Sequence, residues 1–152
     1  MDLKVGDKIP NFKAKDTNGN DFDSQSLVGH KPLVVYFYPK DNTPGCSAQA
    51  CSFRDQYEDF KDLGAEVIGV SSDSVASHQE FTEHYKLPFL LLSDPDKKIK
   101  RLFGVHSQML GLIPGRVTYV IDKNGIIQLI FDSILATRHI PKALEAIKRL
   151  VS

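Results

Sequence analysis

The chain has 152 residues, of which 41% are hydrophobic and 25% are charged, and its 19 basic and 19 acidic side chains give a formal net charge of zero. This length fits one domain of roughly 100 to 200 residues, and the balanced charge excludes a strong general attraction to nucleic acid or to anionic membranes. Every apolar run falls short of the about 18 residues that a membrane span needs. We therefore expect one soluble domain over residues 1–152, with no nucleic-acid or membrane partner.

The first half of the chain predicts a small hairpin followed by a β-α-β unit. Turn-forming residues 17–20 separate two short extended segments, Phe12–Lys15 and Asp21–Phe22. The unit consists of a buried strand at Leu33–Tyr38, a helix at about Pro44–Leu63 and a second buried strand at Glu66–Ser71. Both strands are β-branched and aromatic, whereas the apolar residues of the helix recur at three- and four-residue steps. The two strands should be parallel.

The second half predicts further helices and a partly antiparallel end of the sheet. The expected elements are a helix at Val75–Tyr85, a strand at Pro88–Leu92, a helix at Asp96–Phe103, a hairpin of Val117–Asp122 and Ile126–Phe131, and a closing helix at Ile140–Leu150. A Lys-Asn-Gly turn at 123–125 joins the hairpin strands. The basic residues at 97–101 predict the solvated face of an amphipathic helix rather than a phosphate-binding patch. The fold class is therefore α/β.

The loop before the first helix is the best candidate for an active site. It leaves the carboxyl end of a central strand, where ligands of open α/β sheets bind. With Pro44 at the first helical position, Thr43 becomes the N-cap and Cys46 falls in the first turn. Free backbone N–H groups and the helix dipole favour a thiolate there. We expect Cys46 to be nucleophilic at neutral pH.

Cys51 lies five residues after Cys46 on the same predicted helix. On an ideal helix the two Cα atoms would be about 8 to 9 Å apart. A disulfide needs Cα atoms within about 4.4 to 6.8 Å. Bonding would therefore require the first turns to unwind, with a folded helix in the dithiol and local melting in the disulfide. Packing as a small apolar side chain is the alternative for both cysteines, and it is stronger for Cys51.

Metal binding and cofactor chemistry have little support in the sequence. No third or fourth ligand accompanies the cysteines at a spacing typical of zinc sites, so we expect neither a metal nor a cofactor. The five histidines are scattered, and we interpret all of them as ordinary polar side chains. They are His30, His78, His84, His106 and His139.

The active-site region resembles a known family. Pro39, Thr43 and Cys46 fit the pattern PxxxTxxC, and the segment FYPKDNTPGCSAQACSFRD, with PGRVTYVIDKNG downstream, is similar to the peroxiredoxin Q/bacterioferritin comigratory protein subfamily of peroxiredoxins. The resemblance covers nearly the whole chain. It implies a thioredoxin-like fold, with a central mixed sheet flanked by helices and an N-terminal β-hairpin extension. It also implies a thiol peroxidase that reduces hydrogen peroxide and organic hydroperoxides.

The resemblance assigns a role to each site residue. Cys46 matches the peroxidatic cysteine and Cys51 the resolving cysteine, so a sulfenic acid on the first would condense with the second. Thr43 matches the hydroxyl that hydrogen-bonds thiolate and peroxide, Pro39 the residue that shields the pocket, and Arg116 the guanidinium that polarises it. From the sequence alone, a surface arginine is the more natural interpretation of Arg116.

Partners and location follow from the same resemblance. It implies regeneration by thioredoxin or a glutaredoxin-like dithiol, and a monomer is the simplest expectation because one helix carries both cysteines. Gln49 stands where bacterial members often have an acid, which is similar to plant-type chains. The expected location is the bacterial cytoplasm, or a plastid if a transit peptide has been removed. Two alternatives are a redox sensor without sustained turnover and a thiol-disulfide oxidoreductase, for which Cys-x-x-Cys would be typical.

Overall fold

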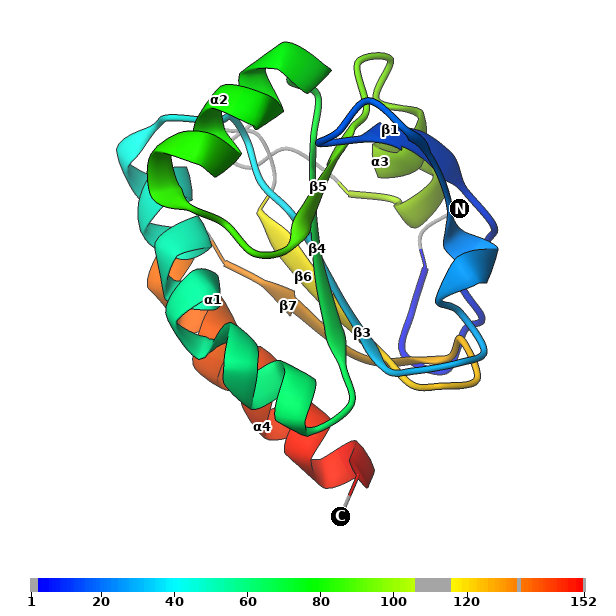
Figure 1. Ribbon diagram of the computed structural model, residues 1–152. Helices are drawn as coiled ribbons and strands as arrows, with labels where there is room; N and C mark the ends of the chain where they lie inside the picture. The colour runs from blue at the N-terminus through cyan, green and yellow to red at the C-terminus, as the bar shows by residue number, and fades with distance from the viewer. Residues whose placement is uncertain (1–2, 106–115, 134, 152) are drawn as a thin grey trace.

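The computed structural model describes residues 3–105, 116–133 and 135–151. In this part of the chain, seven strands form one mixed sheet in the order β2-β1-β5-β4-β3-β6-β7 (Figure 1). The strands are β1 Lys13–Asp16, β2 Asp21–Asp23, β3 Leu33–Phe37, β4 Glu66–Ser71, β5 Leu90–Ser93, β6 Val117–Ile121 and β7 Ile127–Asp132. The helices are α1 Pro44–Asp62, α2 Val75–Tyr85, α3 Lys98–Phe103 and α4 His139–Val151, with short 3-10 helices η1 Ser24–Ser26 and η2 Ala136–Arg138. None of the described helices is long and apolar enough to cross a membrane.

Strand pairing confirms the predicted β-α-β unit and the mixed sheet. β3 and β4 run parallel, with Leu33 opposite Glu66, and α1 is the crossover between them. β5 is also parallel to β4, whereas β6 runs antiparallel to β3 and β7 antiparallel to β6. The N-terminal hairpin joins the sheet because β1 pairs antiparallel with β5. The carboxyl ends of β3, β4 and β5 therefore lie together at one end of the strands, and the loop to α1 begins there.

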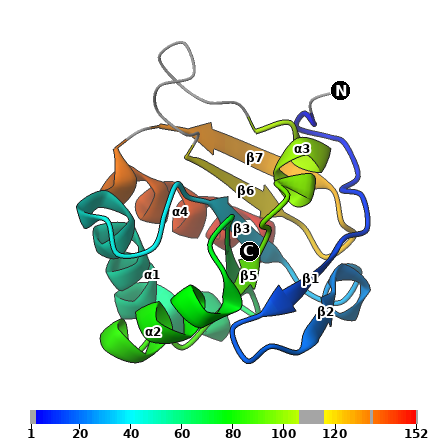
Figure 2. The same ribbon diagram turned by 90° about the horizontal axis from the view of Figure 1, so that it is seen from above.

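Two hydrophobic cores lie on opposite faces of the sheet. α1, α2 and α4 cover one face, and α3 with the N-terminal segment covers the other (Figure 2). The first core includes Tyr36, Phe53, Phe60, Phe81 and Ile147. The second core includes Phe12, Val35, Phe37, Phe103 and Ile121. Successive residues of β3 alternate between the two cores, and each fully buried large side chain contributes about 1.5 to 3 kcal/mol by leaving water.

Packing of α1 on β3 sets the position of the helix that carries both cysteines. The rings of Tyr36 and Phe53 stack with centroids 4.6 Å apart and an interplanar angle of 23°. Gly69 on β4 leaves room for this stack, because a Cβ there would lie 2.8 Å from Cζ of Tyr36. The helix begins at Pro44, as predicted, and ends before Gly64, whose φ of 80° is favourable for glycine. The start of α1 is therefore fixed relative to the end of β3.

Most predicted boundaries lie within one residue of the observed ones, and two differ by two residues. α3 begins at Lys98 rather than at 96, because Lys97 has a left-handed φ of 58° and the Asp94 carboxylate accepts the N–H groups of Ile99 and Lys100, each at 3.0 Å. β5 begins at Leu90 rather than at 88, where proline has no N–H to donate to the ladder. Neither change moves the site.

The N-terminal segment pairs with the start of β7. Gly6 N–H donates to the Ile127 carbonyl at 2.8 Å, Ile127 N–H donates to the Asp7 carbonyl at 2.9 Å, and Ile9 N–H donates to the Gly125 carbonyl at 3.0 Å. Residues 6–9 thus cover one end of this outer strand. At the opposite edge of the sheet, β2 has only three residues.

His139 differs from the expected ordinary polar histidine, because it is fully buried. Its Nε2 lies 2.7 Å from the Ser133 carbonyl, which can only accept, so Nε2 carries the proton. Its Nδ1 then accepts from the Thr118 hydroxyl at 2.7 Å. Burial, and secondarily the nearby Arg116 charge, lower the pKa of His139 from 6.5 to about 4. The imidazole is neutral at pH 7.

Acidification should therefore destabilise the fold through His139. The pKa of His139 is lower in the folded state than in the unfolded state. The contribution of His139 to the free energy of unfolding is therefore present above pH 6.5 and is lost as pH falls toward 4. Linkage between protonation and folding lowers the free energy of unfolding by about 2 kcal/mol between pH 7.5 and pH 5. Urea unfolding across this pH range would measure the loss. For His139→Phe, the free energy of unfolding should change less with pH. The exposed His84→Gln is the control, and equal slopes for His139→Phe and wild type would contradict the assignment.

Candidate active site

Cys46 lies in the first turn of α1, where it was predicted, as a free thiol with 1% exposure. Its sulfur accepts a hydrogen bond from Nη2 of Arg116 at 3.4 Å. The sheet explains this contact between residues far apart in sequence. Val117 of β6 pairs with Phe37 of β3, so the residue before β6 lies at the edge where the active-site loop leaves β3.

Arg116 is 7% exposed, so the interpretation as a surface arginine is wrong. Its Nη1 donates to Oε1 of Gln49, which lies three residues after Cys46 and therefore on the same helical face. Among the described residues, no carboxylate lies within ion-pair distance of this guanidinium. Nε2 of Gln49 is buried and has no hydrogen-bond partner in the same part of the chain. The positive charge of Arg116 is thus directed at a sulfur and a neutral amide.

Gly45 gives the guanidinium of Arg116 more room in the same arrangement. A Cβ at this position would lie 3.1 Å from Nη2 of Arg116. That is closer than most side-chain contacts, so the guanidinium would have to shift by a few tenths of an ångström. The glycine therefore lets Arg116 approach Cys46 over the first turn of the helix.

Thr43 occupies the predicted N-cap position, with extended φ and ψ of −88° and 152°, but its side chain makes no capping hydrogen bond. Its hydroxyl instead donates to the Lys40 carbonyl at 2.9 Å. Thr43 is half-buried and stands three residues before Cys46, and no hydrogen bond between its hydroxyl and the sulfur is present among the described residues.

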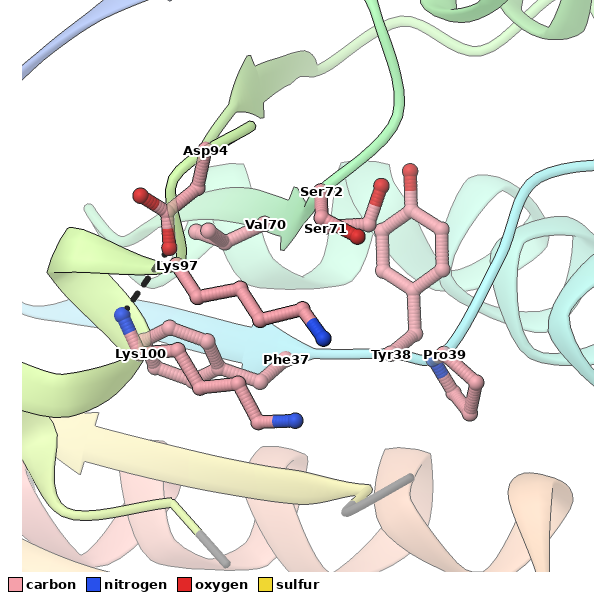
Figure 3. A pocket seen from close by; sticks show the side chains of 9 residues that line it. All are labelled: Phe37, Tyr38, Pro39, Val70, Ser71, Ser72, Asp94, Lys97 and Lys100. Carbon is pink, nitrogen blue, oxygen red and sulfur yellow. Dashed lines mark hydrogen bonds between the residues drawn. The ribbon is translucent and has the colours of Figure 1, made fainter. Parts of the chain in front are cut away.

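Pro39 follows β3 and lines a cavity of about 60 Å³ at the carboxyl ends of β3 and β4 (Figure 3). The ammonium groups of Lys97 and Lys100 extend along this cavity toward Pro39. Burial, followed by the charge of Lys97, lowers the pKa of Lys100. The prediction of a solvated basic face is therefore only partly right, because Lys100 is half-buried.

Cys51 is half-buried on α1, about one and a half turns after Cys46. The helix is continuous from Pro44 to Asp62, and both cysteines are free. This is the folded dithiol conformation that was expected. In it the helix holds the two cysteines too far apart for a disulfide.

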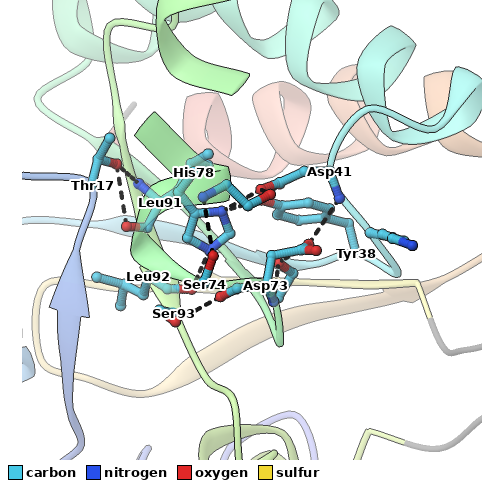
Figure 4. A network of polar contacts seen from close by, with 12 residues as sticks. Thr17, Tyr38, Asp41, Asp73, Ser74, His78, Leu91, Leu92 and Ser93 are labelled. Carbon is cyan, nitrogen blue, oxygen red and sulfur yellow. Dashed lines mark hydrogen bonds and ion pairs between the residues drawn. The ribbon is translucent and has the colours of Figure 1, made fainter. Parts of the chain in front are cut away.

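A buried polar network joins the loop before α1 to α2 (Figure 4). Asp41 accepts hydrogen bonds from the Tyr38 hydroxyl at 2.6 Å and the Ser77 hydroxyl at 2.8 Å, and its Oδ2 lies 2.7 Å from Nδ1 of His78. Burial, with the charge of Asp41 among the further causes, raises the pKa of Tyr38 well above its ordinary value, so this hydroxyl donates. His78 is fully buried, which corrects its interpretation as an ordinary polar histidine. His106 lies outside the described residues.

Asp41, His78 and Asp73 also bring possible metal-ligand atoms within 4.8 Å of one another. Oδ2 of Asp73 accepts from the Asp41 N–H at 2.8 Å and the Ser71 hydroxyl at 2.7 Å. Hydrogen bonds within the protein thus already account for this cluster.

Comparison with known proteins shows the family and the fold. The model of the AhpC/TSA family matches residues 5–130. The chain is 49% identical to chloroplastic peroxiredoxin Q of Oryza sativa subsp. japonica over 97% of its own length and 68% of that protein. The structure resembles peroxidoxin BcpB from Mycobacterium tuberculosis, with a TM-score of 0.90, 33% identity and 99% coverage of both chains. It also resembles the Xanthomonas campestris bacterioferritin comigratory protein, whose trapped intermediate/ligand complexes concern its alkyl peroxide reduction activity, with a TM-score of 0.85 and 30% identity over 93% of this chain and 92% of that one.

These relationships confirm the expected thioredoxin-like peroxiredoxin fold. In this fold the structure has a free, buried cysteine that faces an arginine at the start of a helix. The chain belongs to the AhpC/TSA family, in its peroxiredoxin Q branch, and is a thiol peroxidase.

Proposed function

We propose that Cys46 is the peroxidatic cysteine and that Arg116 stabilises its thiolate and the reacting peroxide. The observation that supports this most is the buried guanidinium 3.4 Å from the Cys46 sulfur, with no carboxylate partner among the described residues. An unbalanced buried cation is costly, and a thiolate is the group in position to balance it. The same guanidinium can also stabilise negative charge that develops on the peroxide.

In the first stage, the Cys46 thiolate attacks the terminal oxygen of a hydroperoxide. An S–O bond forms and the O–O bond breaks, so the sulfur is oxidised by two electrons and the peroxide is reduced. The departing alkoxide or hydroxide takes up a proton from water and leaves as alcohol or water. Thr43 would turn its hydroxyl from the Lys40 carbonyl toward the peroxide. Pro39 would shield the sulfur from bulk water, the role that the family resemblance implies.

In the second stage, the first turns of α1 unwind and Cys51 attacks the sulfenic acid. An S–S bond forms, and the hydroxyl of the sulfenic acid leaves as water with the proton from Cys51. Pro44 and Gly45 at the helix start, and the missing side-chain cap at Thr43, support unwinding at this end. A dithiol of the thioredoxin or glutaredoxin type would then reduce the disulfide.

The chain can complete this cycle as a monomer, because one helix carries both cysteines. Its relatives from plants are chloroplastic, which supports a plastid location as an alternative to the bacterial cytoplasm. Peroxide consumption coupled to a thioredoxin system or to a glutaredoxin system would identify the reductant. Size-exclusion chromatography of the dithiol and disulfide forms would test the monomer.

Cys51→Ser should make a single turnover. It should reduce about one equivalent of peroxide and then stop, because no thiol within the chain can resolve the sulfenic acid. Intact mass under non-reducing conditions should show one added oxygen on the variant, whereas wild type should lose two hydrogen atoms. Sustained turnover by wild type with a reductant would also exclude the sensor alternative.

Ser52→Ala, at the adjacent half-buried position on α1, is the matched control and should retain turnover. Continued turnover by Cys51→Ser at the wild-type rate would overturn the role of Cys51. A wild-type disulfide that runs between two chains would overturn the monomeric cycle.

A further inference from the structure

Asp41 and His78 form a buried pair that joins the active-site loop to α2 (Figure 4). Asp41 is 4% exposed and His78 is not exposed at all, and Oδ2 and Nδ1 lie 2.7 Å apart. Asp41 stands five residues before Cys46 and three before the start of α1. The pair therefore holds the chain just upstream of the segment that must unwind in the catalytic cycle.

The hydrogen bonds fix one proton of this pair. The Leu92 carbonyl lies 3.1 Å from Nε2 of His78 and can only accept, so Nε2 carries a proton. Nδ1 and the Asp41 carboxylate are joined by a short hydrogen bond of 2.7 Å. The hydroxyls of Tyr38 and Ser77 complete the bonding of the carboxylate. Removal of the imidazole would leave a buried acceptor without its strongest donor, which costs more than the net value of one hydrogen bond.

The backbone around Asp41 is held equally firmly. Its N–H donates to Asp73 at 2.8 Å, and the next residue, Asn42, has a left-handed φ of 61°. Asparagine adopts this conformation more readily than most residues other than glycine, so the turn at Asn42 is locally favourable. The Thr43 hydroxyl closes the turn on the Lys40 carbonyl. The loop is thus anchored at residues 40–43.

The first two residues of α1 have weaker support. Pro44 is exposed, Gly45 has no side chain to pack, and Thr43 makes no side-chain cap. A firmly anchored segment is therefore followed directly by one that can melt. This contrast places a defined pivot at Asp41.

We propose that His78 is a positioning residue: through Asp41 it fixes the pivot from which the start of α1 unwinds and re-forms, and so returns Cys46 to Arg116 in each cycle. The proposal rests on the proposed function in one respect, the unwinding that lets Cys51 reach Cys46. It adds two residues to the peroxidase machinery that touch neither the sulfur nor the peroxide. They act on the first stage, which needs the folded turn, and not on the second, which needs the unwound one.

Pre-steady-state kinetics can separate the two stages. In a Cys51→Ser background, sulfenic acid formation depends on Cys46 alone, so the first stage is measured without any disulfide. His78→Leu should lower its second-order rate constant by about 10- to 100-fold, the loss typical of a misplaced reacting group. His78→Asn keeps a donor near the position of Nδ1 and should recover part of the rate. With Cys51 present, the rate of disulfide formation should stay within about twofold of wild type, because unwinding is not impeded.

The resistance of Cys46 to overoxidation is a second measurement. A general loss of fold stability would not be expected to increase this resistance. Sulfinic acid forms when a second peroxide reaches the sulfenic acid before the helix unwinds. His78→Leu should therefore need more peroxide for half-conversion to sulfinic acid, and amide hydrogen exchange should be faster in residues 41–51. The matched control is Thr17→Val, which loses two hydrogen bonds to Leu91, at 2.9 and 3.3 Å, without touching Asp41.

Three outcomes would overturn the proposal. One is a wild-type first-stage rate in folded His78→Leu. Another is equal slowing of both stages, and the third is the same behaviour in Thr17→Val at matched thermal stability. These failures are distinct from failure of the proposed function, which would appear as an unreactive Cys46 or a missing disulfide in the otherwise wild-type chain.

Discussion

Replacing Cys46 by serine is expected to reduce peroxide consumption to the uncatalysed background, a loss of at least about a thousandfold. The hydroxyl introduced by Cys46→Ser would keep a hydrogen-bond acceptor near Arg116, so the pocket should survive. A hydroxyl is barely ionised near pH 7 and is a far weaker nucleophile toward the O–O bond than a thiolate. Steady-state peroxide loss in the presence of excess dithiol would measure the effect.

The Cys46→Ser experiment needs a control for folding and for the second thiol. Circular dichroism should match wild type, and thermal unfolding should occur at a lower temperature, because the buried guanidinium of Arg116 loses the thiolate that balances its charge. Cys51→Ser should still consume its single equivalent of peroxide, so the two cysteines are distinguished in one assay. Normal turnover by Cys46→Ser would remove the basis of the proposed mechanism.

Replacing Arg116 by glutamine is expected to lower the rate constant for Cys46 oxidation by about 100- to 1,000-fold, the range found when one preorganised donor to a developing charge is removed. The guanidinium holds Gln49 with one nitrogen and the Cys46 sulfur with the other. Stopped-flow peroxide competition would measure the rate constant.

Two further variants test the result for Arg116→Gln: the conservative change Arg116→Lys and the control Arg101→Gln. Lysine keeps the charge but cannot reproduce the planar fork, so we expect most of the loss to remain. Arg101 is exposed, and Arg101→Gln should leave the rate unchanged. If Arg116→Gln folds and retains a rate within about threefold of wild type, the guanidinium has no role in peroxide activation.

The elements with strong local signals could be predicted from the sequence. The start of α1 follows from Pro44 after Thr43, and its end from Gly64, because these residue types favour helix boundaries. α2 also has the predicted bounds, with Ser74 as its N-cap. β4 has the predicted bounds because its residues form a short, mostly β-branched run. The placement of Cys46 in the first turn depends only on this local information.

Contacts between distant segments could not be predicted in this way. Asp41 and His78 lie 37 residues apart, and their pairing follows from the parallel packing of β3, β4 and β5. A weak signal existed, since His78 lies three residues before the buried Phe81 and shares its helical face. The burial of Arg116 depends on the antiparallel pairing of β6 with β3, which no local pattern encodes.

Pairing of residues 6–9 with the start of β7 bears on how readily the oxidised protein aggregates. Open edge strands template aggregation, and partly unwound proteins are the most susceptible because they also expose apolar side chains. Here one edge is a strand of three residues and the other is partly occupied by the N-terminal segment. In the proposed cycle, the short β2 and the paired start of β7 would therefore reduce the backbone available for intermolecular strand addition while the start of α1 is open.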